Sequence, residues 1–128
     1  MTSSPKRTGM TAEEALRALC GAWERRDPDA VAQLFSDDGR YEDPLFEQVP
    51  VGPDEIRAAC AEAIDELAEV GVPLQLVATT GDLVLAEGEF LSRTVDGQRL
   101  DFPLAMVLEV RDGLVVRFTE YFDTAPLR

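Results

Sequence analysis

Apolar residues recur every three to four positions through the first half of the chain, a spacing typical of helices that bury one face. Three helices are predicted, over residues 11–26, 27–39 and 53–71, with a short strand at 40–43. The first begins with the capping box of Thr11 and Glu14, and the third ends at a glycine. Their apolar faces include Leu16, Leu19, Cys20 and Trp23, then Val31, Leu34 and Phe35, and finally Ile56, Cys60, Ile64 and Leu67.

After Gly71 the apolar period changes from 3.6 to 2, which indicates strands. Strands are predicted at 73–80, 83–95, 99–110 and 114–123. Three helices followed by an antiparallel meander predict an α+β domain whose curved sheet wraps around the helices. The last two strands are apolar on both faces, so we expect a homodimer through the outer sheet face. The turns between the strands are Gly81-Asp82, Asp96-Gly97 and Asp112-Gly113.

The 128-residue chain reads as one domain, residues 11–128, after a polar leader, residues 1–10, that is predicted to be disordered. No apolar run approaches the ~18 residues of a membrane span, and the start has no secretory apolar segment, so a cytoplasmic location is expected. The net charge of −13 argues against nucleic acid or an anionic membrane as a partner, because phosphates would be repelled.

The chain contains no histidine, which excludes Ser-His-Asp and Cys-His catalysis and metal sites built on histidine. Acid–base chemistry near neutral pH would therefore use carboxylates, tyrosine, lysine or water. Cys20 and Cys60 have no metal or redox spacing and lie on apolar helix faces, which predicts buried thiols. We expect no metal and no other cofactor.

Asp43 is the strongest candidate for a functional residue. The ring of Pro44 disfavours a helical backbone at the residue before it, so the Asp43 side chain is free to point into the space that the fold encloses. A structural role is the alternative, because Asp-Pro is common in turns where the carboxylate accepts backbone N–H groups. Glu87 and Glu89 alternate with apolar neighbours, as in a half-exposed strand, and Glu120 could also face solvent.

The order of elements and several motifs resemble the ketosteroid isomerase and SnoaL-like polyketide cyclase branch of the NTF2-like superfamily. The resemblance runs without gaps from residue 19 to 57 and resumes at 97–116. It implies a cone in which three N-terminal helices pack in a curved, mainly antiparallel sheet of four to six strands. The motifs that carry it are Arg26-Asp27-Pro28-Asp29, Leu34-Phe35-Ser36-Asp37-Asp38, Glu42-Asp43-Pro44, Phe102-Pro103-Leu104-Ala105 and Gly113-Leu114-Val115-Val116.

By this resemblance Asp43 is a general base that moves a proton between two carbons of the substrate. Ketosteroid isomerases also stabilise the dienolate with a tyrosine on the first helix and a protonated aspartic acid on the penultimate strand. The matching residues here are Leu19 and Ala105, and Cys60 matches a supporting tyrosine. Because these donors are absent, efficient steroid isomerisation by the same mechanism is not expected.

The last strand also resembles that of limonene epoxide hydrolases, in which an acidic residue matching Glu120 activates water. In this register Glu120 faces Asp43 across an apolar pocket, and Thr119 and Tyr121 point outward. Tyr41 matches a tyrosine that positions substrate or water. The arginine–aspartate pair of those enzymes has only distant counterparts in Glu87, Glu89 and Arg93.

The expected function is cofactor-free proton transfer, by an isomerase or cyclase, on a hydrophobic polyketide-, terpenoid- or steroid-like molecule. Asp43 would be the base, and Glu120 with Tyr41 the acid. Two alternatives stay open: an epoxide hydrolase or epoxide-opening cyclase with paired carboxylates, and a non-catalytic small-molecule-binding or dimerisation module. The expected substrate contacts are Leu19, Trp23, Phe35, Cys60, Glu89, Ala105, Phe118 and Phe122.

Overall fold

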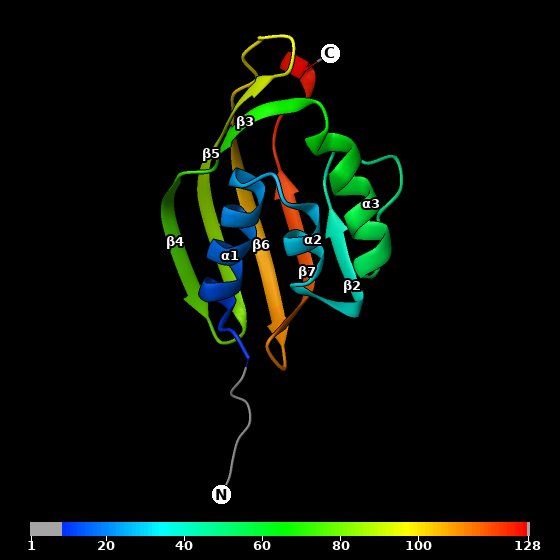
Figure 1. Ribbon diagram of the computed structural model, residues 1–128. Helices are drawn as coiled ribbons and strands as arrows, with labels where there is room; N and C mark the ends of the chain where they lie inside the picture. Colours follow the sequence, from blue (N-terminus) through cyan, green and yellow to red (C-terminus); the bar gives the residue numbers. More distant parts are fainter. Residues whose placement is uncertain (1–8, 128) are drawn as a thin grey trace, which may run out of the picture.

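The computed structural model describes residues 9–127, so residues 1–8 of the predicted leader lie outside the described residues. The predicted α+β class is confirmed: three helices pack against one side of a curled sheet (Figure 1). The helices are α1 (Ala12–Glu24), α2 (Pro28–Ala32) and α3 (Pro53–Ile64), with a short 3-10 helix η1 (Ala125–Leu127) near the C-terminus. The strands are β2 (Phe35–Glu42), β3 (Leu67–Gly71), β4 (Leu74–Thr80), β5 (Leu83–Thr94), β6 (Phe102–Arg111) and β7 (Leu114–Tyr121).

The sheet follows the order β2-β7-β6-β5-β3, and β4 also pairs with β5. All pairs are antiparallel except β2 with β7, which is parallel. The long strand β5 serves two partners, because residues 83–88 pair with β4 and residues 91–94 pair with β3. Figure 1 shows β3 crossing over one end of the sheet, so that this end of the concave side is partly enclosed.

The second helix is shorter than predicted, and the strand after it is longer. Helix α2 ends at Ala32, and Phe35, which was expected on its apolar face, begins β2. Phe35 is nonetheless buried, because it pairs with Val115 of β7 and places its ring in the core. Gly39 does not end a helix but lies at a register shift inside β2, where an added Cβ would lie 2.7 Å from the Val115 carbonyl oxygen. Backbone pairing with β7 therefore overrides the helical period.

The third helix was also predicted too long. It ends at Ile64, and Leu67–Gly71 forms strand β3 instead of the last helical turns. Leu67 lies at helical spacing from Ile64 and is buried, but as the first residue of a strand that pairs with the free half of β5. Burial was thus predicted for the right residue in the wrong element.

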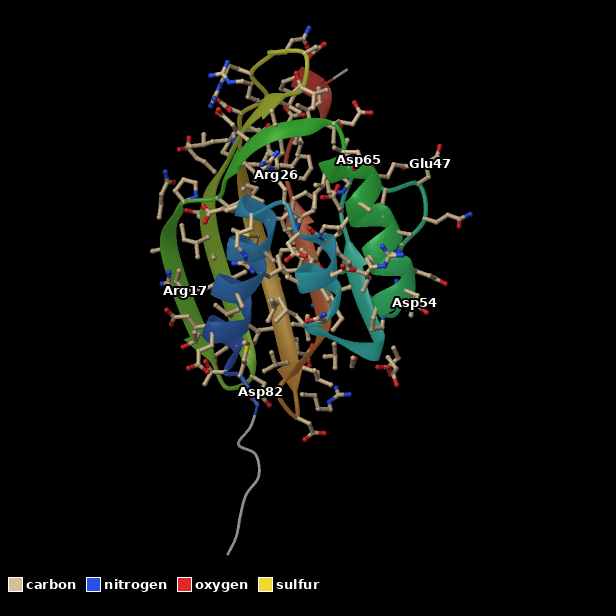
Figure 2. The ribbon with its side chains drawn as sticks, in the orientation of Figure 1. Arg17, Arg26, Glu47, Asp54, Asp65 and Asp82 are labelled. Carbon is tan, nitrogen blue, oxygen red and sulfur yellow. The ribbon has the colours of Figure 1, made fainter. Side chains whose placement is uncertain are left out.

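The four later strands lie close to the predicted ranges, and glycines with positive φ occur at all three predicted turns. The core lies between the helices and the concave face of the sheet, where Leu16, Ile56 and Met106 are among the buried side chains. Charged side chains such as Arg17 and Asp54 lie on helix surfaces away from the sheet (Figure 2). No helix within residues 9–127 is long and apolar enough to cross a membrane.

Candidate active site

A cavity of about 250 Å³ opens on the concave side of the sheet. It lies among α1, the loop after β2, the end of α3 and strands β5–β7. Two of its lining residues, Leu45 and Glu66, are exposed, which marks where the cavity meets solvent. Most of the lining is apolar, and its aromatic members are Trp23, Phe46, Phe90, Phe102, Phe118 and Phe122.

Parallel pairing of β2 with β7 brings the candidate acid–base residues together. Tyr41 pairs with Phe118 in the ladder, and Asp43 follows directly after β2 ends. The Tyr41 hydroxyl donates a hydrogen bond to Glu120 Oε1 at 3.1 Å, and the Glu120 side chain also hydrogen-bonds to Asp43. Glu120 therefore joins Tyr41 and Asp43, from the other end of the chain, in one hydrogen-bonded chain, Tyr41–Glu120–Asp43. Glu120 and Asp43 are here called the acid pair.

Asp43 also has the structural role that was the alternative prediction, because it accepts backbone N–H groups in a turn. Its Oδ1 accepts the N–H of Leu45 at 2.8 Å, and its carbonyl accepts the N–H of Phe46 at 3.0 Å. The turn after β2 thus fixes the Asp43 carboxylate and places Phe46 in the cavity wall. The structural and chemical roles are compatible, because the turn positions the carboxylate that meets Glu120.

Burial raises the pKa of Glu120 well above its usual range, and the neighbouring Asp43 carboxylate raises it further. The hydrogen bond from Tyr41 opposes this shift without cancelling it. Burial and the charge of Glu120 also raise the pKa of the Tyr41 hydroxyl well above its usual range. These shifts favour the protonated carboxylic acid form of Glu120 and the neutral, hydrogen-bond-donating form of Tyr41.

A second group of polar side chains fastens β2 to β7 on the opposite, convex face. Thr119 Oγ1 donates to Glu42 Oε1 at 2.7 Å and accepts from Arg117 Nε at 3.1 Å. Arg40 lies 3.3 Å from Glu42, whose pKa is lowered first by the Thr119 hydrogen bond. Because Glu42 and Thr119 are the last ladder pair before Asp43, these contacts support the placement of the acid pair.

The structure brings six of the predicted site residues into the cavity lining: Leu19, Trp23, Asp43, Phe118, Glu120 and Phe122. Tyr41 lies behind Glu120, where it is fully buried, and packs against Phe35 and Phe118 with centroids 5.8 and 4.9 Å away. As predicted for the last strand, Tyr121 is exposed, whereas Thr119 is buried by its convex-face contacts.

Four predicted substrate contacts are not in the lining. Ala105 pairs with Glu87 and Tyr121, both exposed, so it lies on the convex face of the sheet. Glu89 is two residues from Glu87 on β5 and therefore lies on the same convex face. There it accepts an exposed hydrogen bond from Gln75. The predictions that Ala105 and Glu89 contact the substrate are therefore wrong. A shift of one residue along a strand moves a side chain to the opposite face of the sheet. Phe35 and Cys60 are buried in the core behind the lining.

Sequence reasoning missed the other lining residues, among them Phe46, Phe90, Phe102 and Met106. The inward direction of Phe90 and Met106 could have been predicted, because side chains alternate along a strand and both residues lie at inward-facing positions. Met106 is the neighbour of Ala105, which was predicted instead. The direction of Phe46 could not have been predicted, because its position depends on the turn that Asp43 forms. The indole N–H of Trp23 is buried and has no hydrogen-bond partner among residues 9–127.

The two cysteines are free and buried, as predicted. Burial raises the pKa of each thiol to about 12, with Glu120 as the next contribution in both cases. Neither is a thiolate near neutral pH, so neither is suited to act as a nucleophile. In the part of the chain that the structure describes, no group of three or more His, Cys, Asp or Glu side chains is arranged to hold a metal ion.

A sequence profile described as "SnoaL-like domain" matches residues 16–118. No curated protein matches the sequence. Among solved structures, a protein with a ketosteroid isomerase-like fold from Catenulispora acidiphila, in complex with trimethylamine, has a TM-score of 0.79 at 23% identity. That match covers 89% of this chain and 88% of the other.

Two further matches are candidate polyketide cyclases. The one from Jannaschia, described as SnoaL-like, has a TM-score of 0.78 at 15% identity and covers 98% of this chain and 94% of its own. The one from Pseudomonas putida has a TM-score of 0.76 at 20% identity and covers 90% and 93%. At these identities the similarity shows the fold and nothing about the reaction.

Proposed function

The chain belongs to the SnoaL-like domain family, and from this premise we propose that it is a cofactor-free isomerase or cyclase that moves a proton on a hydrophobic small molecule. The observation that carries the proposal is the acid pair at the wall of an apolar cavity, where burial and the neighbouring Asp43 raise the pKa of Glu120. Two structures that share this fold are described as candidate polyketide cyclases, which makes a cyclase a reaction class to test.

The proposed reaction starts with a carbonyl compound whose oxygen meets Glu120. The Glu120 O–H turns from Asp43 to the carbonyl oxygen, which frees the Asp43 carboxylate to take a proton from the adjacent carbon. The electrons of the broken C–H bond form a C=C bond while the Glu120 proton moves to the carbonyl oxygen, so the carbonyl becomes an enol and Glu120 a carboxylate. In a β,γ-unsaturated ketone, Asp43 then gives its proton to the γ-carbon and Glu120 takes back the enol proton, which shifts the double bond. In ring closure the enol carbon attacks a second carbonyl, Glu120 takes back the enol proton, and Asp43 gives its proton to the new alkoxide oxygen. Tyr41 holds Glu120 in place throughout through its hydrogen bond.

Exchange of α-protons tests this proposal without knowledge of the natural substrate. A ketone such as 1-tetralone is incubated with the protein in D2O, and deuterium uptake next to the carbonyl is followed by NMR. Asp43→Asn keeps the shape of the side chain and removes its basicity, so we expect exchange to slow by at least about 100-fold. Asp37→Asn, an exposed change on β2, is the matched control.

Catalysed exchange that persists unchanged in Asp43→Asn would contradict the assignment of the base. An epoxide probe in the same assay addresses the paired-carboxylate alternative, because epoxide hydrolysis adds the mass of one water. Nothing in the cavity favours that alternative specifically: Glu89 lies on the other face, and Arg93 is paired with Glu69.

Binding without catalysis is the second candidate function. Leu19 occupies the lining where the ketosteroid isomerase resemblance places a tyrosine donor, which weakens the case for an oxyanion site. A structural relative was solved with trimethylamine, so a small amine is a ligand to test beside the ketones. Ligand affinity that is equal in the wild type and in Asp43→Asn, with no exchange in either, would favour this function.

We also propose that two copies pair through the convex face of the sheet. The cross-strand register places a group of apolar residues there, here called the convex patch: Leu76, Leu85, Ala105, Val107 and Tyr121. Leu76, Leu85 and Tyr121 are 60%, 44% and 53% exposed, which is unusual for large apolar residues gathered on one face. Charged residues of both signs flank the patch: Arg40, Glu42, Glu87, Glu109 and Arg117. A surface with both signs can pair with a second copy of itself.

A further inference from the structure

We propose that the cavity accepts an uncharged ketone of one or two rings, and that three stacked rings, Phe90, Phe102 and Phe122, set the upper limit of its size. This inference rests on the proposed function for the role of the ketone oxygen. It excludes four-ring compounds and ligands that carry a carboxylate or phosphate.

The volume sets the scale of the ligand. An apolar cavity of about 150 Å³ is known to hold a molecule of benzene. In proportion, the 250 Å³ available here suits roughly ten non-hydrogen atoms. That is the size of a single substituted ring or of two fused rings, whereas a four-ring skeleton has about twice as many atoms and would extend through the mouth at Leu45 and Glu66.

The charge of the lining excludes anions. Asp43, Glu66 and Glu120 are its acidic members, and no Lys or Arg from residues 9–127 joins them. The whole chain carries a net charge of −13, so an anionic ligand is repelled both at a distance and inside the cavity.

The cavity is also poorly suited to bind an ammonium group. The Asp43 carboxylate already accepts hydrogen bonds from the Leu45 N–H and from Glu120. A cation would lose its water and gain an acceptor that is largely satisfied. A ketone oxygen, by contrast, needs only the one O–H that Glu120 can supply.

The aromatic stack forms a continuous wall across the concave face. Phe90 and Phe102 are directly paired on β5 and β6, with ring centroids 5.1 Å apart, and Phe102 stacks at 4.4 Å on Phe122, which directly follows β7. Trp23 of α1 meets Phe90 edge to face at 6.1 Å, so the wall extends from the first helix to the last strand. Phe102 is the central ring, and its removal opens the wall without touching Asp43 or Glu120.

Trp23 makes the test direct, because it is the only tryptophan in the chain and it lines the cavity. The full chain is titrated with 2-cyclohexenone, 1-tetralone, anthrone and androst-4-ene-3,17-dione, a series of one to four rings, and its fluorescence is recorded. We expect the one- and two-ring ketones to bind at least about tenfold more tightly than the four-ring ketone. Equal or tighter binding of the four-ring ketone would overturn the size limit.

Two charged analogues test the second part of the inference. 1-Aminotetralin and tetralin-1-carboxylate share the two-ring skeleton of 1-tetralone and differ in charge. Weaker binding of both, by about tenfold or more, supports an uncharged ligand. Comparable or tighter binding of either analogue would overturn it, and tight binding of the amine would favour the amine-binding function instead.

Phe102→Ala tests the wall itself. We expect this variant to bind anthrone more tightly than the wild type does, by about tenfold, with little change for 2-cyclohexenone. Leu114→Ala removes a comparable side chain at the far end of β7, where it is 42% exposed, and should leave the series unchanged. Thermal unfolding identifies loss of folding, and Phe102→Leu then provides a milder enlargement. If both variants fold and bind the four ketones with the same affinities as the wild type, the role of the stack is overturned.

These outcomes are separable from those for the proposed function. Asp43→Asn removes the base but leaves the wall, so its size series should match the wild type even when proton exchange is lost. A preserved size preference with no exchange in the wild type would refute the reaction alone. Exchange that is catalysed equally for two-ring and four-ring ketones would refute the size limit alone.

Discussion

The pKa of Glu120 is raised because of where the fold places this residue. The residue lies on a strand with Phe118 and Phe122 on either side along the same face, and its remaining neighbours include Tyr41 and Asp43. Desolvation disfavours its charged form, and a nearby carboxylate adds to the effect. A residue in this state can donate a proton at neutral pH, but it makes the folded protein sensitive to pH.

The sign of that sensitivity follows from the raised pKa. Above the usual value of about 4.5 the unfolded chain releases the Glu120 proton while the folded chain keeps it. Stability should therefore fall as pH rises from about 4.5 until the folded pKa is passed, by at most about 1.4 kcal/mol per pH unit from this residue.

Glu120→Gln should remove this loss. We expect the variant to be more stable than the wild type at pH 8 and to differ less at pH 5, as measured by urea unfolding at both values. Glu87→Gln, an exposed change on β5, serves as the control and should follow the wild type. The same loss of stability with pH in Glu120→Gln as in the wild type would mean that Glu120 is not the responsible group.

Single residues were predictable where a local rule fixes their direction. Pro44 keeps Asp43 out of a helix, and strand alternation places Phe118, Glu120 and Phe122 on one face. Ala105 was assigned by similarity of position rather than by parity, and the pairing of β6 places it on the other face. Which inward residues line a cavity and which are sealed in the core depends on packing among distant elements, which no local pattern contains.

At the scale of elements, the strands with period-2 alternation and glycine turns were predictable. Of the two strands that follow helices, β2 was predicted only at its end, residues 40–43, and β3 was not predicted. Phe35 and Leu67 both continue a helical apolar stripe, so their local pattern favours helix. Each begins a strand because an otherwise unpaired strand edge lies beside it, that of β7 in one case and that of the second half of β5 in the other. Pairing with a strand that is distant in sequence decides the structure of each segment, and no local pattern in either segment indicates that pairing.

Two glycine-to-alanine changes should separate these local and tertiary requirements. In Gly39→Ala the new Cβ would lie 2.7 Å from the Val115 carbonyl oxygen, so β2 must shift, and we expect a loss of about 1–3 kcal/mol. In Gly21→Ala, within α1, the nearest atom is 3.4 Å away at the flexible end of Arg25, and alanine should stabilise the helix by about 0.5–1 kcal/mol. Chemical denaturation measures both. A neutral Gly39→Ala would show that β2 tolerates displacement from β7.

At the scale of the whole molecule, the sheet presents two different faces. The concave face holds the cavity, and the convex patch exposes large apolar side chains between charged ones. Pairing of two copies would bury that patch, yet each copy brings a net charge of −13. Association should therefore depend on ionic strength, because salt screens the repulsion between the two acidic chains.

Sedimentation of the full chain measures this association. We expect a dimer whose dissociation constant falls as salt is raised from about 0.02 to 0.5 M. Leu85→Asp places a charge in the convex patch and should give monomers. Val95→Asp, at a hairpin position that is 69% exposed and outside the patch, should not. A monomer at all salt concentrations would contradict the pairing.

The parallel pairing of β2 with β7 has a consequence for how the protein comes into being. Tyr41 and Glu120 are 79 positions apart, and Glu42 and Thr119 are 77 apart. Contacts at such separation carry a large loop-closure cost, so they form late in folding. On the ribosome, the helices and β3–β6 emerge before β7 exists, and until then Asp43 has no acid beside it. The proposed acid–base chemistry is therefore absent from every partial product of synthesis that lacks the last strand.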